Sequence, residues 1–166
     1  MAESAIAKVR SRYAGSAERP LGSFLALMSA YGGLVTTASL LLRSAGRGLP
    51  HRIGSRDLVL LAVATFKLSR VMAKDPVTSP LRAPFTKFKS QAGEAELDEE
   101  VVGKGPQKAI GELVTCPFCL DQWIATALTL GWLANPRLAR LVASTLTVVT
   151  AADVLQFGYD ALQSSA

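Results

Sequence analysis

LGSFLALMSAYGGLVTTASLLL, from Leu21 to Leu42, is a run of 22 residues without a charged side chain. As an α-helix it would be roughly 33 Å long, enough to cross a bilayer core of about 30 Å. The positive mean hydropathy of +0.28 and a charged fraction of only 19% are also unusual for a soluble domain. We therefore expect an integral membrane protein.

Three later segments have the composition of membrane helices, at about 58–73, 113–134 and 138–159. The 58–73 segment carries Lys67 and Arg70 in its second half. It therefore either spans the bilayer with these side chains extended to the surface or lies flat. The expected fold is all-α: an integral membrane helical bundle with three or four transmembrane helices, in a single domain over 21–162.

A basic arm, residues 1–20, precedes this domain, and a polar loop, residues 74–112, interrupts it. The apolar run after the arm is too long for the hydrophobic region of a signal peptide, so we interpret it as an uncleaved anchor. Within the loop, Pro76, Pro80 and Pro84 predict an irregular, rigid strap. The acidic run over 94–100 predicts a solvated flexible loop, or else a docking surface for a partner. No strand pattern is visible.

The distribution of basic residues predicts the orientation in the membrane. With four spans, both termini and the 74–112 loop share one side, which carries ten Lys and Arg residues against six on the other. The positive-inside rule then places the loop in the cytoplasm. The net charge of +5 suits anionic lipid head groups, and no nucleic-acid-binding module is present.

Both cysteines lie in the stretch Thr115-Cys116-Pro117-Phe118-Cys119, at the mouth of the third apolar segment. Thr115 or Cys116 is placed to cap a helix, with Pro117 in the first turn and Cys119 one turn further on the same side. The helix dipole would favour the thiolate of Cys116, as in a thiol–disulfide pair. However, the βαβ surround of such motifs is missing, and so is a second cysteine pair. We favour a structural role over redox chemistry.

No metal or resident cofactor is expected. Two cysteines and one histidine, His51, do not fill a four-ligand zinc site within one chain. A quinone would be needed only if Cys116 and Cys119 formed a redox-active pair.

Two acids lie within apolar segments, Asp121 in the third and Asp153 in the fourth. Because a bare carboxylate in lipid is costly, each should face a partner inside the bundle, with Lys67 or Arg70 the natural candidate. A structural ion pair is favoured over a proton or ion pathway.

Several separated motifs occur in an order that resembles a known family. They are Lys67-Leu68-Ser69-Arg70, Lys74-Asp75, Ser79-Pro80-Leu81-Arg82-Ala83-Pro84-Phe85, Gly111-Glu112-Leu113, and the cysteine stretch with Trp123. Over about residues 57–162 the chain is similar to the bacterial membrane-protein family catalogued as domain of unknown function 1360. The resemblance implies a location in the bacterial cytoplasmic membrane, without an agreed activity. It adds weight to Arg70, Asp75, Arg82, Glu112, Cys116 and Cys119. Phe85, in the same motif as Arg82, is a further candidate for partner binding or structure.

The sequence therefore favours a non-enzymatic membrane anchor or subunit. It would bind a partner membrane or cytoplasmic protein, or another copy of itself, through the cytoplasmic loop. The alternative is a membrane thiol–disulfide oxidoreductase in which Cys116 attacks and Cys119 resolves.

Overall fold

The computed structural model describes residues 12–13, 19–48 and 52–164. Most of the basic arm, including Lys8 and Arg10, and His51 lie outside the described residues. The elements are α2 (Leu21–Ser44), α3 (Ser55–Lys74), a 3₁₀ turn (Pro76–Thr78), α4 (Ser79–Arg82), β1 (Thr86–Gly93), β2 (Glu96–Val101), α5 (Pro106–Thr115), α6 (Pro117–Ala134) and α7 (Pro136–Ser164).

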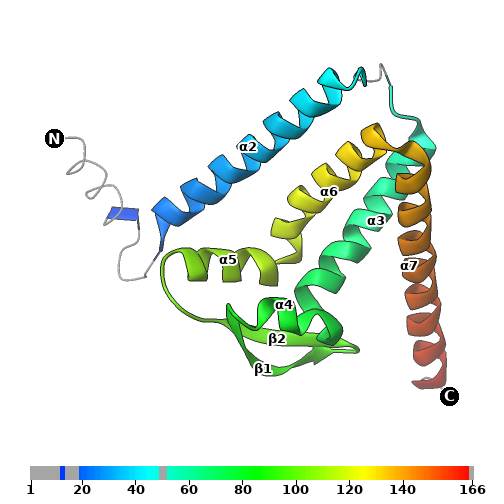
Figure 1. The fold of residues 1–166 in the computed structure, drawn as a ribbon. Coiled ribbons are helices and arrows are strands. Elements are labelled where there is room, and N and C mark those ends of the chain that lie inside the picture. The colour runs from blue at the N-terminus through cyan, green and yellow to red at the C-terminus, as the bar shows by residue number, and fades with distance from the viewer. Residues whose placement is uncertain (1–11, 14–18, 49–51, 165–166) are drawn as a thin grey trace.

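Helix α3 is the centre of the molecule, packed between α6 and α7 (Figure 1). One buried cluster joins Leu61 and Ala64 of α3 to Ala143 of α7. A second joins Ala73 of α3 to Leu120 and Ile124 of α6. The alanines allow the backbones to approach closely, which is how helices associate in lipid.

Two helices, α2 and α7, are long and apolar enough to cross a membrane, and the bent pair α5–α6 would make a third span. Helix α3 is long enough, with 20 residues, but it is not apolar enough to be counted with them. Its second half carries Lys67, Arg70 and Lys74. Length and composition thus support membrane association, and the expected span at 58–73 is not among these candidate spans.

The segment expected to span at about 113–134 is bent near its start. Helix α5 ends at Thr115, α6 begins at Pro117, and the two axes meet at 82°. Cys116 lies at the corner with extended backbone angles, φ −104° and ψ 106°. Proline disfavours a helical conformation in the residue before it and lacks the N–H that would continue α5.

The all-α expectation is incomplete, because the polar loop contains a two-stranded antiparallel sheet, β1 with β2. The acidic run therefore does not form a flexible loop. Four of its five carboxylates lie in β2, and three of these pair with cations: Glu96 with α3, Glu99 with α4 and Asp98 across the strand pair. The strap over 75–85 is likewise regular, since it forms the 3₁₀ turn and α4.

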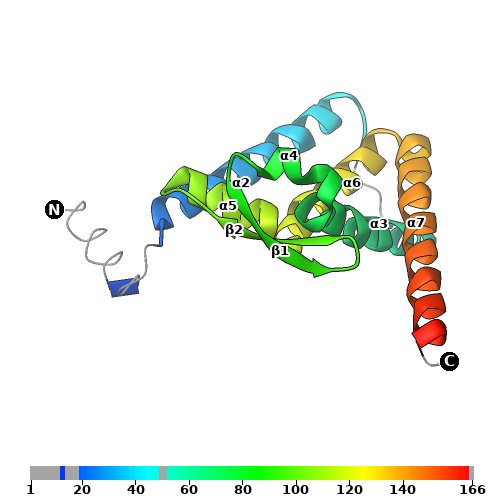
Figure 2. The same ribbon diagram turned by 90° about the horizontal axis from the view of Figure 1, so that it is seen from below.

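The elements define two ends of the molecule. The sheet, α5, the start of α2 and the end of α7 lie at one end, and the α2–α3 and α6–α7 connections lie at the other (Figure 1). Seen from below, the sheet covers the end of the helical bundle (Figure 2). This arrangement agrees with the expectation that the loop and the ends of the helical domain share a side.

Candidate functional site: the hairpin cap and the cavity beside it

We call residues 75–115 the cap, and Arg82 at its centre holds it together. The Arg82 side chain is 1% exposed and that of its partner Glu99 is 6% exposed. Arg82 Nε and Nη2 donate to the two carboxylate oxygens of Glu99 at 2.6 and 3.1 Å. Its other donors reach the carbonyls of Met72 and Asp75 and the hydroxyl of Thr78, at 2.7–3.1 Å. All five N–H groups of the guanidinium are thereby used.

These bonds join the end of α3, the 3₁₀ turn, α4 and β2 around one cation. Asp75 caps the turn, because its Oδ1 accepts from the amide of Val77 at 2.8 Å. Thr86, the first residue of β1, donates its hydroxyl to the Arg82 carbonyl at 3.0 Å. Asp75 and Arg82, which the family motifs single out, therefore serve the internal structure of the cap.

Helix α5 packs against the base of the sheet at Gly111. A Cβ on Gly111 would lie 2.6 Å from Cγ1 of Val101 and 3.0 Å from the carbonyl oxygen of Phe85. The same Phe85 oxygen accepts from the amide of Val102 at 2.9 Å. The Phe85 backbone thus lies directly against α5 at Gly111, where the space is too small for a side chain.

The hairpin is tied to α3 and across its own strands by exposed or half-exposed ion pairs. Arg70 donates through Nε at 2.9 Å and through Nη2 to Glu96 Oε1, while its guanidinium lies 5.8 Å from the centre of the Phe66 ring. Across the strands, Lys89 lies 2.9 Å from Asp98, and this contact lowers the pKa of Asp98 below its ordinary value. Such exposed pairs add little stability compared with the buried Arg82 pair.

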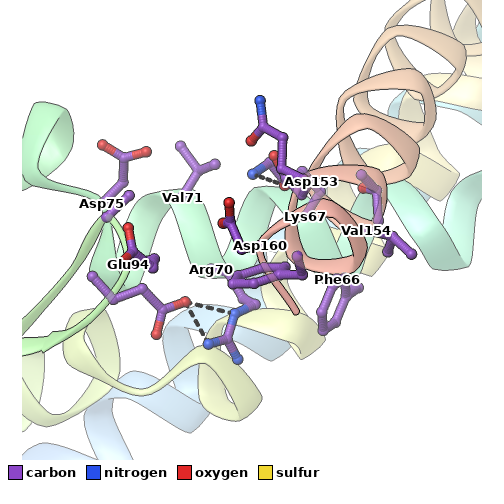
Figure 3. A pocket seen from close by; sticks show the side chains of 14 residues that line it. Phe66, Lys67, Arg70, Val71, Asp75, Glu94, Asp153, Val154 and Asp160 are labelled. Carbon is purple, nitrogen blue, oxygen red and sulfur yellow. Dashed lines mark hydrogen bonds and ion pairs between the residues drawn. The ribbon is translucent and has the colours of Figure 1, made fainter. Parts of the chain in front are cut away.

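A cavity of about 440 Å³ lies between the second half of α3, the hairpin turn and the second half of α7 (Figure 3). Its walls are partly apolar, from Phe66, Val71, Val154 and Phe157. Its polar lining contains more acidic than basic side chains: Asp75, Glu94, Glu96, Asp153 and Asp160 against Lys67 and Arg70.

The two basic groups of this cavity are already paired. Lys67 Nζ binds Asp153 Oδ2, as Figure 3 shows, and Arg70 binds Glu96. The expected partnership of Lys67 with an acid thus involves Asp153. Asp121 forms an ion pair with neither Lys67 nor Arg70. Its Oδ1 is buried without a hydrogen-bond partner among the described residues.

Cys116 and Cys119 occupy the corner between α5 and α6. Cys116 is the N-cap of α6, with its Sγ accepting from the amide of Cys119 at 3.2 Å, and Pro117 is in the first turn, as the sequence predicts. The two sulfurs lie 2.7 Å apart. Cys119 and Phe118 are exposed, so the pair is accessible.

Glu112, the remaining motif residue, binds Arg19 at 3.3 Å and so connects α5 to the entry of α2. Helix α2 also packs on α6 through Tyr31. The Tyr31 hydroxyl forms hydrogen bonds with Thr126 at 2.7 Å and with Gln122 at 2.6 Å, and the Tyr31 ring lies edge-on to the Trp123 ring, with 5.1 Å between their centres.

Among the described residues, no group of three or more His, Cys, Asp or Glu is placed to hold a metal ion.

The residues that sequence reasoning missed are the partners in the cap, chiefly Glu96, Glu99, Thr78 and Thr86. The signal in the sequence that could have led to Glu99 is Arg82, the arginine of the proline-containing motif. A motif arginine in a polar loop needs a carboxylate, and the acidic run is the nearest source of one.

Fold and site together define a small helical, membrane-associated protein with a rigid polar cap at one end. The chain belongs to the family described as protein of unknown function DUF1360, whose model matches residues 60–159.

Two relatives come from Bacillus subtilis (strain 168). Sporulation protein YjcA is 30% identical over 107 residues, which is 63% of this chain and 91% of the relative. UPF0713 protein YngL is 27% identical over 106 residues, which is 63% of this chain and 79% of the relative. No solved structure gives a significant match.

Proposed function

We propose that this chain is a non-enzymatic, multi-pass protein of the bacterial cytoplasmic membrane whose cap binds a partner protein on the cytoplasmic side. The observation that carries the proposal is the internal use of the polar motif residues of the cap. Asp75, Arg82 and Glu99 are bound to one another or to backbone, so they hold a shape and are not free to act on a substrate.

Strand β1 is an exposed part of this cap that a partner could contact. Its first residue, Thr86, is buried, and the remaining residues are exposed. Phe88 is 68% exposed and stands between Lys87 and Lys89. An aromatic side chain held on a fixed strand is a typical anchor of protein interfaces. We assign to Phe88 a partner protein with an apolar pocket.

The test replaces Phe88 by a photo-crosslinking phenylalanine analogue in native membranes. Val148 on α7, 67% exposed, receives the same analogue as the matched control. The expected result is a discrete protein adduct from position 88 and lipid adducts only from position 148. Lipid adducts alone from both positions would contradict the proposal.

A second candidate function, thiol–disulfide exchange, is favoured by the geometry of the α5–α6 corner. The Cys116 thiolate would attack one sulfur of a substrate disulfide, forming a mixed disulfide and releasing one substrate thiolate. Cys119 would then attack the Cys116 sulfur and release the second substrate thiol. The pair is thereby oxidised, and the substrate is reduced by two electrons. In this direction a reductant must then restore the Cys116–Cys119 dithiol. A quinone accepts electrons, so it would serve only the reverse reaction of this second function, in which it oxidises the pair and the resulting disulfide oxidises a substrate dithiol.

Labelling with a membrane-impermeant maleimide in intact cells separates the two candidates. Labelling only after reduction would place an oxidised Cys116–Cys119 pair outside and favour the exchange reaction. Labelling without reductant, and only after lysis, would place free thiols inside and favour the partner-binding function.

A further inference from the structure

The end of the molecule opposite the cap carries the net positive charge of the chain. We call its six arginines the arginine end: Arg43, Arg47, Arg52, Arg56, Arg137 and Arg140. Its single acid is Asp57. Removing these seven residues from the totals of 18 basic and 13 acidic leaves 12 of each, so the rest of the chain is neutral. The end of α2, the start of α3, the end of α6 and the start of α7 lie at this end (Figure 1).

One of these arginines is fixed in place by the single acid. Arg140 of α7 donates through Nε and Nη2 to the two oxygens of Asp57 on α3, both at 2.8 Å. The Asp57 side chain is 10% exposed and that of Arg140 is 52% exposed. The buried carboxylate therefore orients the guanidinium, while Nη1 makes no hydrogen bond with any described residue.

A second arginine stands beside this pair without a hydrogen bond to any described residue. Arg56 precedes Asp57 on α3, and it lines a cavity of about 370 Å³ with Asp57, Leu60, Arg140 and Ser144. Two arginines and one carboxylate thus line this cavity, which leaves one positive charge unmatched. Gly54 provides no side-chain cap for the start of α3, so the positive helix end adds to the same potential.

The geometry points to a binding site for the phosphate group of an anionic phospholipid, with Arg56 and Arg140 as its ligands. Guanidinium groups match phosphate oxygens with paired N–H donors, and here one of them is held ready by Asp57. The Ser144 hydroxyl supplies a neutral donor. Leu60, part of the packing between α3 and α7, supplies an apolar wall for the start of an acyl chain.

The position of the cavity favours a lipid over free phosphate as the source of the bound phosphate group. It lies where α3 and α7 begin, and α7 is a candidate membrane span. A phospholipid in the surrounding bilayer has its phosphate at the level of helix ends and its chains beside the helices.

The experiment measures lipid retention by native mass spectrometry of the full chain in detergent, with phosphatidylglycerol and phosphatidylcholine as probes. Arg56→Gln removes one ligand without breaking a hydrogen bond in the described structure. Arg43→Gln at the end of α2 is the matched control, since it lowers the charge of the same end but lies outside the cavity. We expect Arg56→Gln to weaken phosphatidylglycerol binding about tenfold, and Arg43→Gln to change it less than about twofold.

Two outcomes overturn the inference. Equal weakening by both substitutions would mean that phosphatidylglycerol is attracted by the overall charge of the arginine end and not by a site formed by Arg56 and Arg140. If inorganic phosphate displaced the bound phosphatidylglycerol at millimolar concentration, the site would be one for free phosphate. Because this site lies opposite the cap, its failure leaves the test at Phe88 unaffected.

Discussion

At the scale of single residues, the most consequential side chain is Arg82, because it is both charged and almost fully buried. Arg82→Gln would leave the Glu99 carboxylate buried without its partner, which costs about 3–5 kcal/mol of stability. We expect a lower unfolding temperature in detergent and protease cleavage within the cap. Lys89→Gln removes an exposed ion pair and serves as the control, with an expected change within about 0.5 kcal/mol. Similar effects of the two substitutions would contradict the central role of Arg82.

Gly111 gives a second prediction at this scale. Gly111→Ala would bring Cβ against Val101 and the Phe85 carbonyl, and the backbone oxygen has no freedom to move away. We expect a loss of about 1–3 kcal/mol, as for other overpacked sites, measured by thermal unfolding. Gly131→Ala in α6 meets no atom within 4 Å and should be neutral or slightly stabilising. Equal stability of the two variants would mean that α5 is not pressed against the sheet.

At the scale of elements, α2 depends on a few polar contacts, because none of its residues is buried. Tyr31→Phe keeps the ring contact with Trp123 but removes the hydroxyl that bonds Thr126 and Gln122. We expect a loss of about 1 kcal/mol and stronger quenching of Trp123 fluorescence as α2 separates from α6. Tyr159→Phe, which loses only an exposed bond to Gln163, should change neither measurement. An unchanged Tyr31→Phe variant would show that α2 is held by other contacts.

The elements also show how far sequence reasoning reached. The charge-free run at 21–42 and the apolar fourth segment predicted α2 and α7, because length and hydropathy are local properties. The N-cap role of Cys116 followed from the position of Pro117. The hairpin could not be predicted in this way. Its strands have no apolar alternation, and its acidic residues are stabilised by cations from α3 and α4 that only the fold brings near.

At the scale of the whole molecule, the arrangement of the two ends predicts labelling from opposite sides of the membrane. In a chain without Cys116 and Cys119, a cysteine at Ser90 reports on the hairpin and one at Ser44 on the end of α2, both exposed positions. With a cytoplasmic cap, an impermeant maleimide should reach position 44 in intact cells and position 90 only after lysis. The reverse pattern would invert the orientation, and labelling of both positions from one side would mean that α3, the helix between them, does not cross the membrane.

The break at Cys116 has a consequence for the membrane itself. Because α5 turns away by 82°, α6 has only 18 residues and is about 27 Å long, shorter than a hydrocarbon core of about 30 Å. Helix α2, with 24 residues, is about 36 Å long and would tilt to fit the same core. If α2 and α6 both cross the bilayer, a short and a long helix side by side impose hydrophobic mismatch on the surrounding lipids. The protein should therefore thin the bilayer beside α6 and collect in regions where the membrane is already thin.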